Sequence, residues 1–286
     1  MNSNDAKPRW RDMDAEERAL AYSPSKALPD GDLTPYIDAY VRDSAEVHQT
    51  YGPARVLEYG DAPSQTIDLF LPKDLSNTPL HIFIHGGYWQ ALSKTESCFA
   101  AAGFLENGVG FAAIDYTLAP KATLDEIIAE TLNAVSYLFE NAQRLGIDPT
   151  RISISGSSAG AHLAAMTCLG LAPEQKPNSV ILFSGIFELE PLIGTYVNDP
   201  LHLDIPKAQK NSPLLKNLNK FPKALIAWGE IETDEFKRQS QYFAGQLPHA
   251  ETFEIPHRNH FDVVYELSNG SPLAQRVLSL VTCKGM

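Results

Sequence analysis

The chain has little positive charge and no long apolar run. It has 286 residues, of which 23 are Lys or Arg and 35 are Asp or Glu, so its formal net charge at pH 7 is −12. Nucleic acids and anionic membranes are normally bound by a basic surface, so the charge argues against both as partners. No apolar run approaches the roughly 18 residues of a membrane span, which argues against a transmembrane protein.

Cysteine is also scarce. Cys98, Cys168 and Cys283 are the three cysteines, and this odd number forms no disulfide framework and suits a reducing compartment. The polar start, Met1–Glu17, contains no apolar stretch of the roughly 7–15 residues found in a secretory signal. We therefore expect a cytoplasmic protein. Its length and its 44% hydrophobic residues are enough for one large core, which predicts a single domain over residues 1–286.

Apolar strand patterns alternate with helical ones along most of the chain. The clearest helix is predicted over Leu124–Leu145, where apolar residues recur every three or four positions. Thr123 and Glu126 form a capping box at its start, and Gly146 ends it. This alternation predicts an α/β fold with a mostly parallel central sheet flanked by helices. The predicted strands are Gln65–Leu71, Leu80–Ile84, Gly110–Tyr116, Arg151–Ser155, Val180–Ser184, Ala224–Trp228 and Thr252–Ile255.

A Gly-x-Ser-x-Gly motif, Gly156–Gly160, lies between the strand Arg151–Ser155 and the Ala-rich run Ala161–Leu171. Strand, sharp turn and helix are the context of a nucleophile elbow, in which glycines let strand and helix pass close together. The motif predicts Ser158 as a nucleophile. The alternative is that Ser158 only caps the helix.

A second glycine motif follows the buried strand Leu80–Ile84. It reads His85-Gly86-Gly87-Tyr88-Trp89, and its glycines allow backbone N–H groups to point into a site. Together with the N–H of Ala159, those of Gly86 and Gly87 are predicted to form an oxyanion hole. The alternative is a plain turn. We expect His85 to orient this loop rather than to act in catalysis.

The acid partner of a serine nucleophile is expected after the strand Ala224–Trp228. Four carboxylates follow within Gly229–Glu235. In the α/β-hydrolase pattern the acid lies about three residues beyond the glycine that ends this strand, which selects Glu232. Asp234 is the alternative, and the other acids are expected to form a solvated turn.

The base is expected on the loop after the last strand, where two histidines lie within Pro256–Asp262. His260 is preferred because it comes last, directly before Phe261 and the apolar run that starts the closing helix. His257 is the alternative, because spacing alone does not decide between the two imidazoles. A zinc site using both would have no nearby cysteine and no clear third ligand, so no metal and no other cofactor is expected.

These motifs together resemble the serine-hydrolase type of kynurenine formamidase, also called arylformamidase. The resemblance covers about residues 20–280. It implies the α/β-hydrolase fold and a small-molecule substrate, N-formyl-L-kynurenine, which would be hydrolysed to L-kynurenine and formate in tryptophan catabolism. The segments that carry it are Tyr22–Ser25, His85–Gln90, Ala119–Lys121, Thr123–Asp125, Ser158–Met166, Ser184-Gly185, Leu189–Pro191, Asn211–Pro213, Glu235-Phe236, Arg238–Ser240 and His260-Phe261.

Two positions depart from that family. Its members carry aspartate where this chain has Glu232, and commonly carry histidine where it has Ser157. A glutamate can still accept the N–H of His260, while Ser157 borders the expected pocket and bears on the choice of acyl group. The alternative function is therefore a carboxylesterase or deformylase acting on another short-acyl aryl ester or amide. The sequence leaves open whether the protein is a monomer or a homodimer.

Two stretches do not fit the alternation of strands and helices: the N-terminal segment to Ala54 and the segment 186–215. We expect both to cover the site, the second as a lid-like insertion. Aromatic residues in or near them are predicted substrate contacts, with packing in the core as the alternative. The predicted substrate contacts are Tyr22, Tyr88, Trp89, Phe187 and, in the elbow, Ser157.

Overall fold

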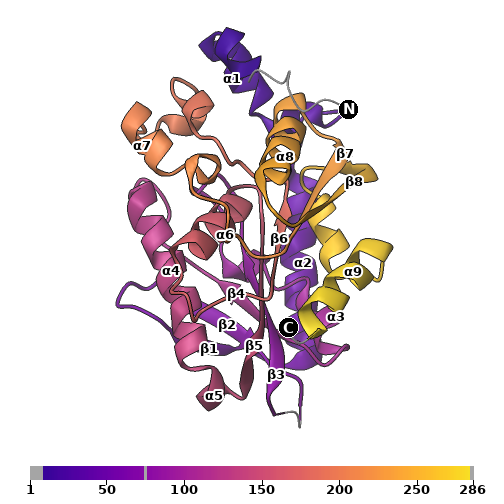
Figure 1. The fold of residues 1–286 in the computed structure, drawn as a ribbon. Helices are drawn as coiled ribbons and strands as arrows, with labels where there is room; N and C mark the ends of the chain where they lie inside the picture. Colours follow the sequence, from indigo (N-terminus) through magenta and orange to yellow (C-terminus); the bar gives the residue numbers. More distant parts are fainter. Residues whose placement is uncertain (1–8, 74–75, 284–286) are drawn as a thin grey trace.

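An eight-stranded sheet forms the centre of the protein (Figure 1). The computed structural model describes residues 9–73 and 76–283, and orders the strands β1-β2-β4-β3-β5-β6-β7-β8. All neighbours from β4 to β8 in this order are parallel, and β1 and β2 join the edge in antiparallel pairing. The predicted, mostly parallel sheet is confirmed. The strands are β1 Arg55–Glu58, β2 Thr66–Phe70, β3 Thr78–Ile84, β4 Gly110–Ile114, β5 Ile147–Ser157, β6 Ser179–Phe183, β7 Ala224–Ile231 and β8 Ala250–Asn259.

Helices cover both faces of this sheet (Figure 1). Residues of α4, α5, α6 and α8 belong to one buried apolar cluster, and residues of α2, α3 and α9 belong to another. Among the described residues, no helix combines the length and the apolar character needed to cross a membrane. The helices are α1 Ala15–Ala21, α2 Thr34–Tyr51, α3 Ala101–Leu105, α4 Leu124–Glu140, α5 Ala142–Leu145, α6 Ala159–Gly170, α7 Ile205–Lys210, α8 Asp234–Gln246 and α9 Pro272–Thr282.

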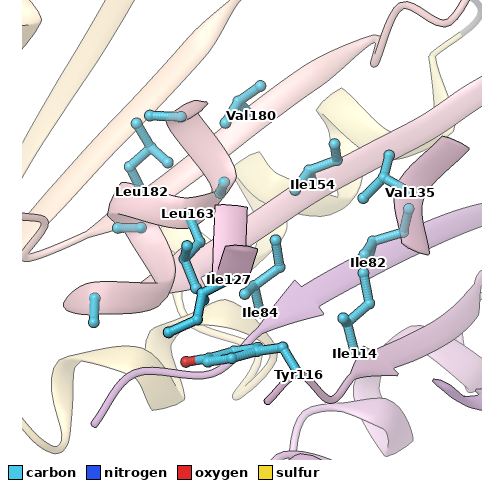
Figure 2. Close-up of a cluster of buried hydrophobic side chains, with 14 of the residues drawn as sticks. Ile82, Ile84, Ile114, Tyr116, Ile127, Val135, Ile154, Leu163, Val180 and Leu182 are labelled. Atoms are coloured by element: carbon cyan, nitrogen blue, oxygen red, sulfur yellow. The ribbon is translucent and has the colours of Figure 1, made fainter. Parts of the chain in front are cut away.

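The larger core lies between the central strands and the pair α4 and α6. Figure 2 shows Ile82 of β3 and Ile154 of β5 on the same side of the sheet as Val135 of α4 and Leu163 of α6. Every residue of β3 is buried, because helices pack on both of its faces. Burial on both faces explains why apolar residues occupy most positions of this strand instead of alternating with exposed polar ones.

The structure lengthens several predicted elements and adds one strand. β1 was not predicted, because three of its four residues are exposed and it has no apolar run. The predicted helix over 124–145 is two helices with a break at Asn141. Its ends are as predicted, since the Thr123–Glu126 capping box is present and Gly146 has a φ of 77° that favours glycine.

The two segments predicted to cover the site pack against different parts of the domain. Of the N-terminal segment, residues 1–8 lie outside the described part, and α2 packs into the cluster that contains α3 and α9. The segment 186–215 contains short 3-10 turns and α7, and its apolar residues, including Leu192 and Val197, are mostly buried in the larger core. The segment is therefore packed against the rest of the domain, and its Tyr196 lines the cavity at Ser158; its role as a lid stays a prediction.

Candidate active site

Ser158 occupies a strained turn between β5 and α6. Its φ of 57° and ψ of −120° are unusual for a residue other than glycine. Ser158 stands at the N-cap position of α6, but its side chain makes no capping hydrogen bond there, so its hydroxyl is not used to cap the helix. The flanking glycines are needed because a Cβ at Gly156 would lie 2.2 Å from the Gly160 carbonyl oxygen, and one at Gly160 would lie 2.1 Å from that of Ile84.

Parallel pairing brings the loop His85–Trp89 beside Ser158. Ile84 at the end of β3 pairs with Gly156 of β5, so the residues that follow both strands meet at one edge of the sheet. A Cβ on Gly86 would lie 2.7 Å from the Ser157 carbonyl oxygen and 3.3 Å from the Ser158 Cβ. Glycine is thus required where this loop passes the serine.

The residues predicted to form the oxyanion hole, Gly86, Gly87 and Ala159, come from the glycine loop and from the start of α6. Ala159 is the first residue of α6, a position whose N–H has no acceptor within a helix. Gly87 has a φ of 92°, and a Cβ there would lie 2.2 Å from the Ala91 carbonyl oxygen. His85 supports the loop, because its Nδ1 lies 2.9 Å from the Gly86 carbonyl oxygen and its ring stacks on Tyr116. This contact agrees with the orienting role expected for His85.

The same rule of parallel pairing joins Glu232 to His260. Ile231 of β7 pairs with Asn259 of β8, and the next residue of each strand is the predicted acid or base. The His260 Nδ1 lies 2.9 Å from the Glu232 Oε2, and both side chains are buried. His257, the alternative base, has a side chain that is 93% exposed and lies beside Glu230. The structure therefore favours His260.

The Glu232 carboxylate is held by two further hydrogen bonds. Its Oε1 accepts from the Ser184 hydroxyl and from the Gly229 N–H, each at 2.6 Å. These two hydrogen bonds hold the carboxylate in the orientation in which its other oxygen faces His260. Asp234, the alternative acid, is exposed on the first residue of α8. The geometry therefore favours Glu232.

Two adjacent residues at the end of the glycine loop, Tyr88 and Trp89, tie it to other parts of the chain. Tyr88 and Trp89 have φ values of 51° and 58°, so both depart from the usual backbone region. The Tyr88 hydroxyl donates to the Tyr22 carbonyl, and the Trp89 Nε1 donates to the His162 Nδ1 at 3.2 Å. The other nitrogen of His162 lies 2.7 Å from the Asn211 carbonyl oxygen, and burial lowers the pKa of this imidazole to about 4. His162 is therefore a neutral link between the loop and α6.

Ser158 and His260 open into one cavity with a volume of about 510 Å³. Its walls are mainly apolar and come from the N-terminal segment, the glycine loop with its continuation to Phe99, Tyr196 and the loop after β8. A volume of this size suits a small organic substrate. The lining residues are Pro24, Ser25, Leu33, Ile37, Tyr40, Phe83, His85, Gly86, Gly87, Tyr88, Gln90, Ala91, Leu92, Glu96, Ser97, Phe99, Ser157, Ser158, Tyr196, His260, Phe261 and Val264.

Of the five predicted substrate contacts, the structure places Tyr88 and Ser157 on this wall. The other three are corrected, because their rings are fully buried in the protein. Tyr22 donates to Glu235 at 2.9 Å, Trp89 is bonded to His162, and Phe187 stacks on Phe243. These three side chains pack in the protein interior and do not line the cavity.

Sequence reasoning missed several aromatic residues on the cavity wall. Tyr40, Phe99, Tyr196 and Phe261 all line it, and they come from four distant parts of the chain. A partial signal was present, because Leu33, Ile37 and Tyr40 are spaced as one face of a helix. Whether this face turns toward the cavity depends on how α2 packs against the rest of the domain, and the spacing of residues along the chain does not determine that packing.

One cluster among the described residues has side chains of types that bind metals. Donor atoms of His48, Asp68 and Cys98 lie within 4.8 Å of one another. The Lys94 ammonium lies 2.5 Å from the Asp68 carboxylate and already supplies a positive charge there. Burial raises the pKa of the Cys98 thiol to about 12, so it is protonated near neutral pH and a poor ligand.

Comparison with known proteins agrees with this geometry. The BD-FAE family model matches residues 67–199. A kynurenine formamidase from Danio rerio is 30% identical over 94% of this chain and 97% of its own length, and one from Salmo salar is 30% identical over 96% and 98%. The chain belongs to the kynurenine formamidase family of α/β-hydrolases.

A solved structure that is similar to this chain supports the fold over most of its length. It is a putative thioesterase from Silicibacter sp. TM1040, with a TM-score of 0.82 and 26% sequence identity. The alignment covers 92% of this chain and 98% of the thioesterase. The predicted α/β-hydrolase fold is thereby confirmed. This fold carries many hydrolytic activities, so the substrate has to be argued from the site.

Proposed function

We propose that this protein is a serine hydrolase that removes the formyl group from an aryl amine, with N-formyl-L-kynurenine as its substrate. The observation that carries the proposal is the buried His260–Glu232 pair beside the strained Ser158, with the serine and the histidine opening into one cavity. Membership of the kynurenine formamidase family supports the choice of substrate.

Catalysis would begin with the Ser158 hydroxyl. The His260 Nε2 takes its proton as the oxygen attacks the formyl carbon, and Glu232 stabilises the imidazolium through Nδ1. The carbonyl oxygen becomes an oxyanion, which the N–H groups of Gly86, Gly87 and Ala159 stabilise. Hydrogen bonds from fixed backbone donors require no reorganisation as this charge forms.

The leaving group is the aryl amine. His260 returns its proton to the amine nitrogen, the carbon–nitrogen bond breaks and a formyl ester remains on Ser158. A water molecule, deprotonated by His260, attacks this ester and releases formate, and the proton returns to the serine oxygen. The arrangement suits a small acyl group, because the Gly86 backbone passes close to Ser158, while the apolar wall suits an aromatic ring.

A carboxylesterase acting on short aryl esters is the second candidate. The same residues would perform that reaction, and Glu232 and Ser157 both differ from the residues that the family resemblance implies. A comparison of kcat/KM for N-formyl-L-kynurenine and p-nitrophenyl acetate distinguishes the two functions. Strong preference for the formamide supports our proposal, whereas hydrolysis of the ester alone supports the second candidate.

The experiment that tests the nucleophile is Ser158→Ala. We expect kcat to fall by about 10⁵ or more for either substrate, because the acyl-enzyme can no longer form. Retained turnover in the variant would contradict the assignment. A fluorophosphonate probe should label the wild-type protein and leave Ser158→Ala unlabelled.

A further inference from the structure

We propose that Glu96 forms a subsite for a cationic amine on the substrate, which in N-formyl-L-kynurenine is the α-ammonium group. The inference rests on the proposed function and specifies which substrate charge the cavity prefers. Glu96 ends the short 3-10 turn Lys94–Glu96 and is half-buried. It lines the same cavity as Ser158 and His260.

The charges around the cavity are unbalanced. Among the described lining residues, Glu96 is the one carboxylate, and none is Lys or Arg. The two lining histidines are already engaged, since His260 pairs with Glu232 and His85 contacts the Gly86 carbonyl. A bound molecule therefore meets one negative charge and no lysine or arginine.

The Glu96 carboxylate has no cationic partner in the described part of the chain. Its Oε2 accepts a hydrogen bond from the Ser93 hydroxyl at 2.8 Å, which fixes its orientation. The neighbouring Lys94 points its ammonium at Asp68 instead. A carboxylate beside an apolar wall is costly without a countercharge, and a ligand ammonium would supply one.

This arrangement ranks substrates by charge. An ammonium gains an ion pair with Glu96, a neutral group gains nothing, and a carboxylate is repelled. The carboxylate of an amino-acid substrate would therefore lie away from Glu96, toward solvent. We infer that the cavity takes aryl formamides with a cationic amine, in preference to neutral and then to purely anionic ones.

Three substrates and one substitution test the ranking. N-formyl-L-kynurenine is a zwitterion, 4-(2-formamidophenyl)-4-oxobutanoate lacks the amine and is an anion, and 2′-formamidoacetophenone is neutral. Glu96→Gln keeps an oxygen that accepts from Ser93 but removes the charge. We expect kcat/KM to fall about tenfold for the zwitterion, rise severalfold for the anion and stay unchanged for the neutral compound.

The crossed pattern separates recognition from structural damage. A variant that only disturbed the fold would lower all three values together, and that result would overturn the proposal, as would an unchanged value for the zwitterion. Glu140→Gln is the matched control, because Glu140 is an exposed acid at the end of α4 that is not among the cavity-lining residues. It should leave all three values unchanged.

Binding measurements separate this inference from the proposed function. Calorimetry with L-kynurenine and with 4-(2-aminophenyl)-4-oxobutanoate requires no formamide hydrolysis. If the wild type binds kynurenine about tenfold more tightly and Glu96→Gln abolishes the difference, the subsite stands even if no formamide is hydrolysed. Equal affinity for the two compounds in the wild type would overturn it, whatever the reaction proves to be.

Discussion

Replacing Glu232 by glutamine should inactivate the protein by turning the His260 imidazole to the wrong tautomer. In the wild type, Glu232 Oε1 accepts from the Gly229 N–H and the Ser184 hydroxyl, while Oε2 faces the His260 Nδ1. A backbone N–H cannot accept, so the glutamine carbonyl must occupy the Oε1 position. Its NH₂ group then faces the His260 Nδ1 and donates to it.

The expected loss of kcat follows from the change in which His260 nitrogen carries the proton. A His260 Nδ1 that accepts must carry its proton on Nε2, where the lone pair that takes the Ser158 proton is needed. The corresponding change of acid to amide in the Ser-His-Asp triad of other hydrolases costs about 10⁴ in kcat, or about 5 kcal/mol. We expect a loss of this size with KM little changed, because Glu232 is not among the residues that line the cavity.

The assay is steady-state hydrolysis of p-nitrophenyl acetate and N-formyl-L-kynurenine by the variant and by Asp234→Asn. The second variant is the matched control and should retain kcat within about threefold of wild type, since Asp234 is exposed at the start of α8. If Glu232→Gln retains kcat within about tenfold of wild type, or if Asp234→Asn shows the large loss instead, the tautomer argument fails.

Two further predictions concern the glycine loop and acid stability. Gly86→Ala should lower kcat by about 10² with little change in KM, because the added Cβ would displace an oxyanion donor. Gly245→Ala in α8 is the control and should leave kcat unchanged, because a Cβ there meets nothing within 4 Å. Equal kcat values for the two variants would contradict the role of Gly86 in the oxyanion hole. Burial lowers the pKa of His81 to about 3 and that of His162 to about 4, so unfolding takes up protons below the ordinary histidine pKa of about 6.5. Stability should therefore be full above that pH and fall by about 2–3 kcal/mol for each histidine by pH 4.5, as measured by urea unfolding, with a flatter pH profile for His162→Gln.

The α/β-hydrolase pattern was enough to predict which residues meet, because its strands are parallel. Residues that directly follow neighbouring parallel strands emerge at the same edge. β3 and β5 are neighbours, so the loop with Gly86 lies beside Ser158, and β7 and β8 are neighbours, so Glu232 lies beside His260. The strand patterns and the two glycine motifs therefore contained the geometry of the candidate site.

The cavity wall could not be predicted in the same way. Tyr88 and Trp89 are adjacent and both have positive φ, yet Tyr88 lines the cavity and Trp89 is buried against His162. Tyr40 reaches the cavity because α2 packs beside the loop that follows β8. The Tyr40 hydroxyl donates to the Phe261 carbonyl in that loop. Such orientations depend on contacts between segments far apart in the chain, about which local patterns carry little information.

The choice of glutamate as the acid illustrates how local sequence and packing act together. Gly229 lets β7 approach β8 closely, since a Cβ there would lie 2.3 Å from the Arg258 carbonyl oxygen. The Glu232 carboxylate then meets donors from three parts of the chain, at Gly229 in β7, at Ser184 directly after β6 and at His260 directly after β8. An aspartate on this backbone would be shorter by about 1.5 Å, one carbon–carbon bond, and could not keep all three hydrogen bonds without a backbone shift. The longer acid is therefore matched to the way β7 ends, and the departure from the family's aspartate is compatible with the same chemistry.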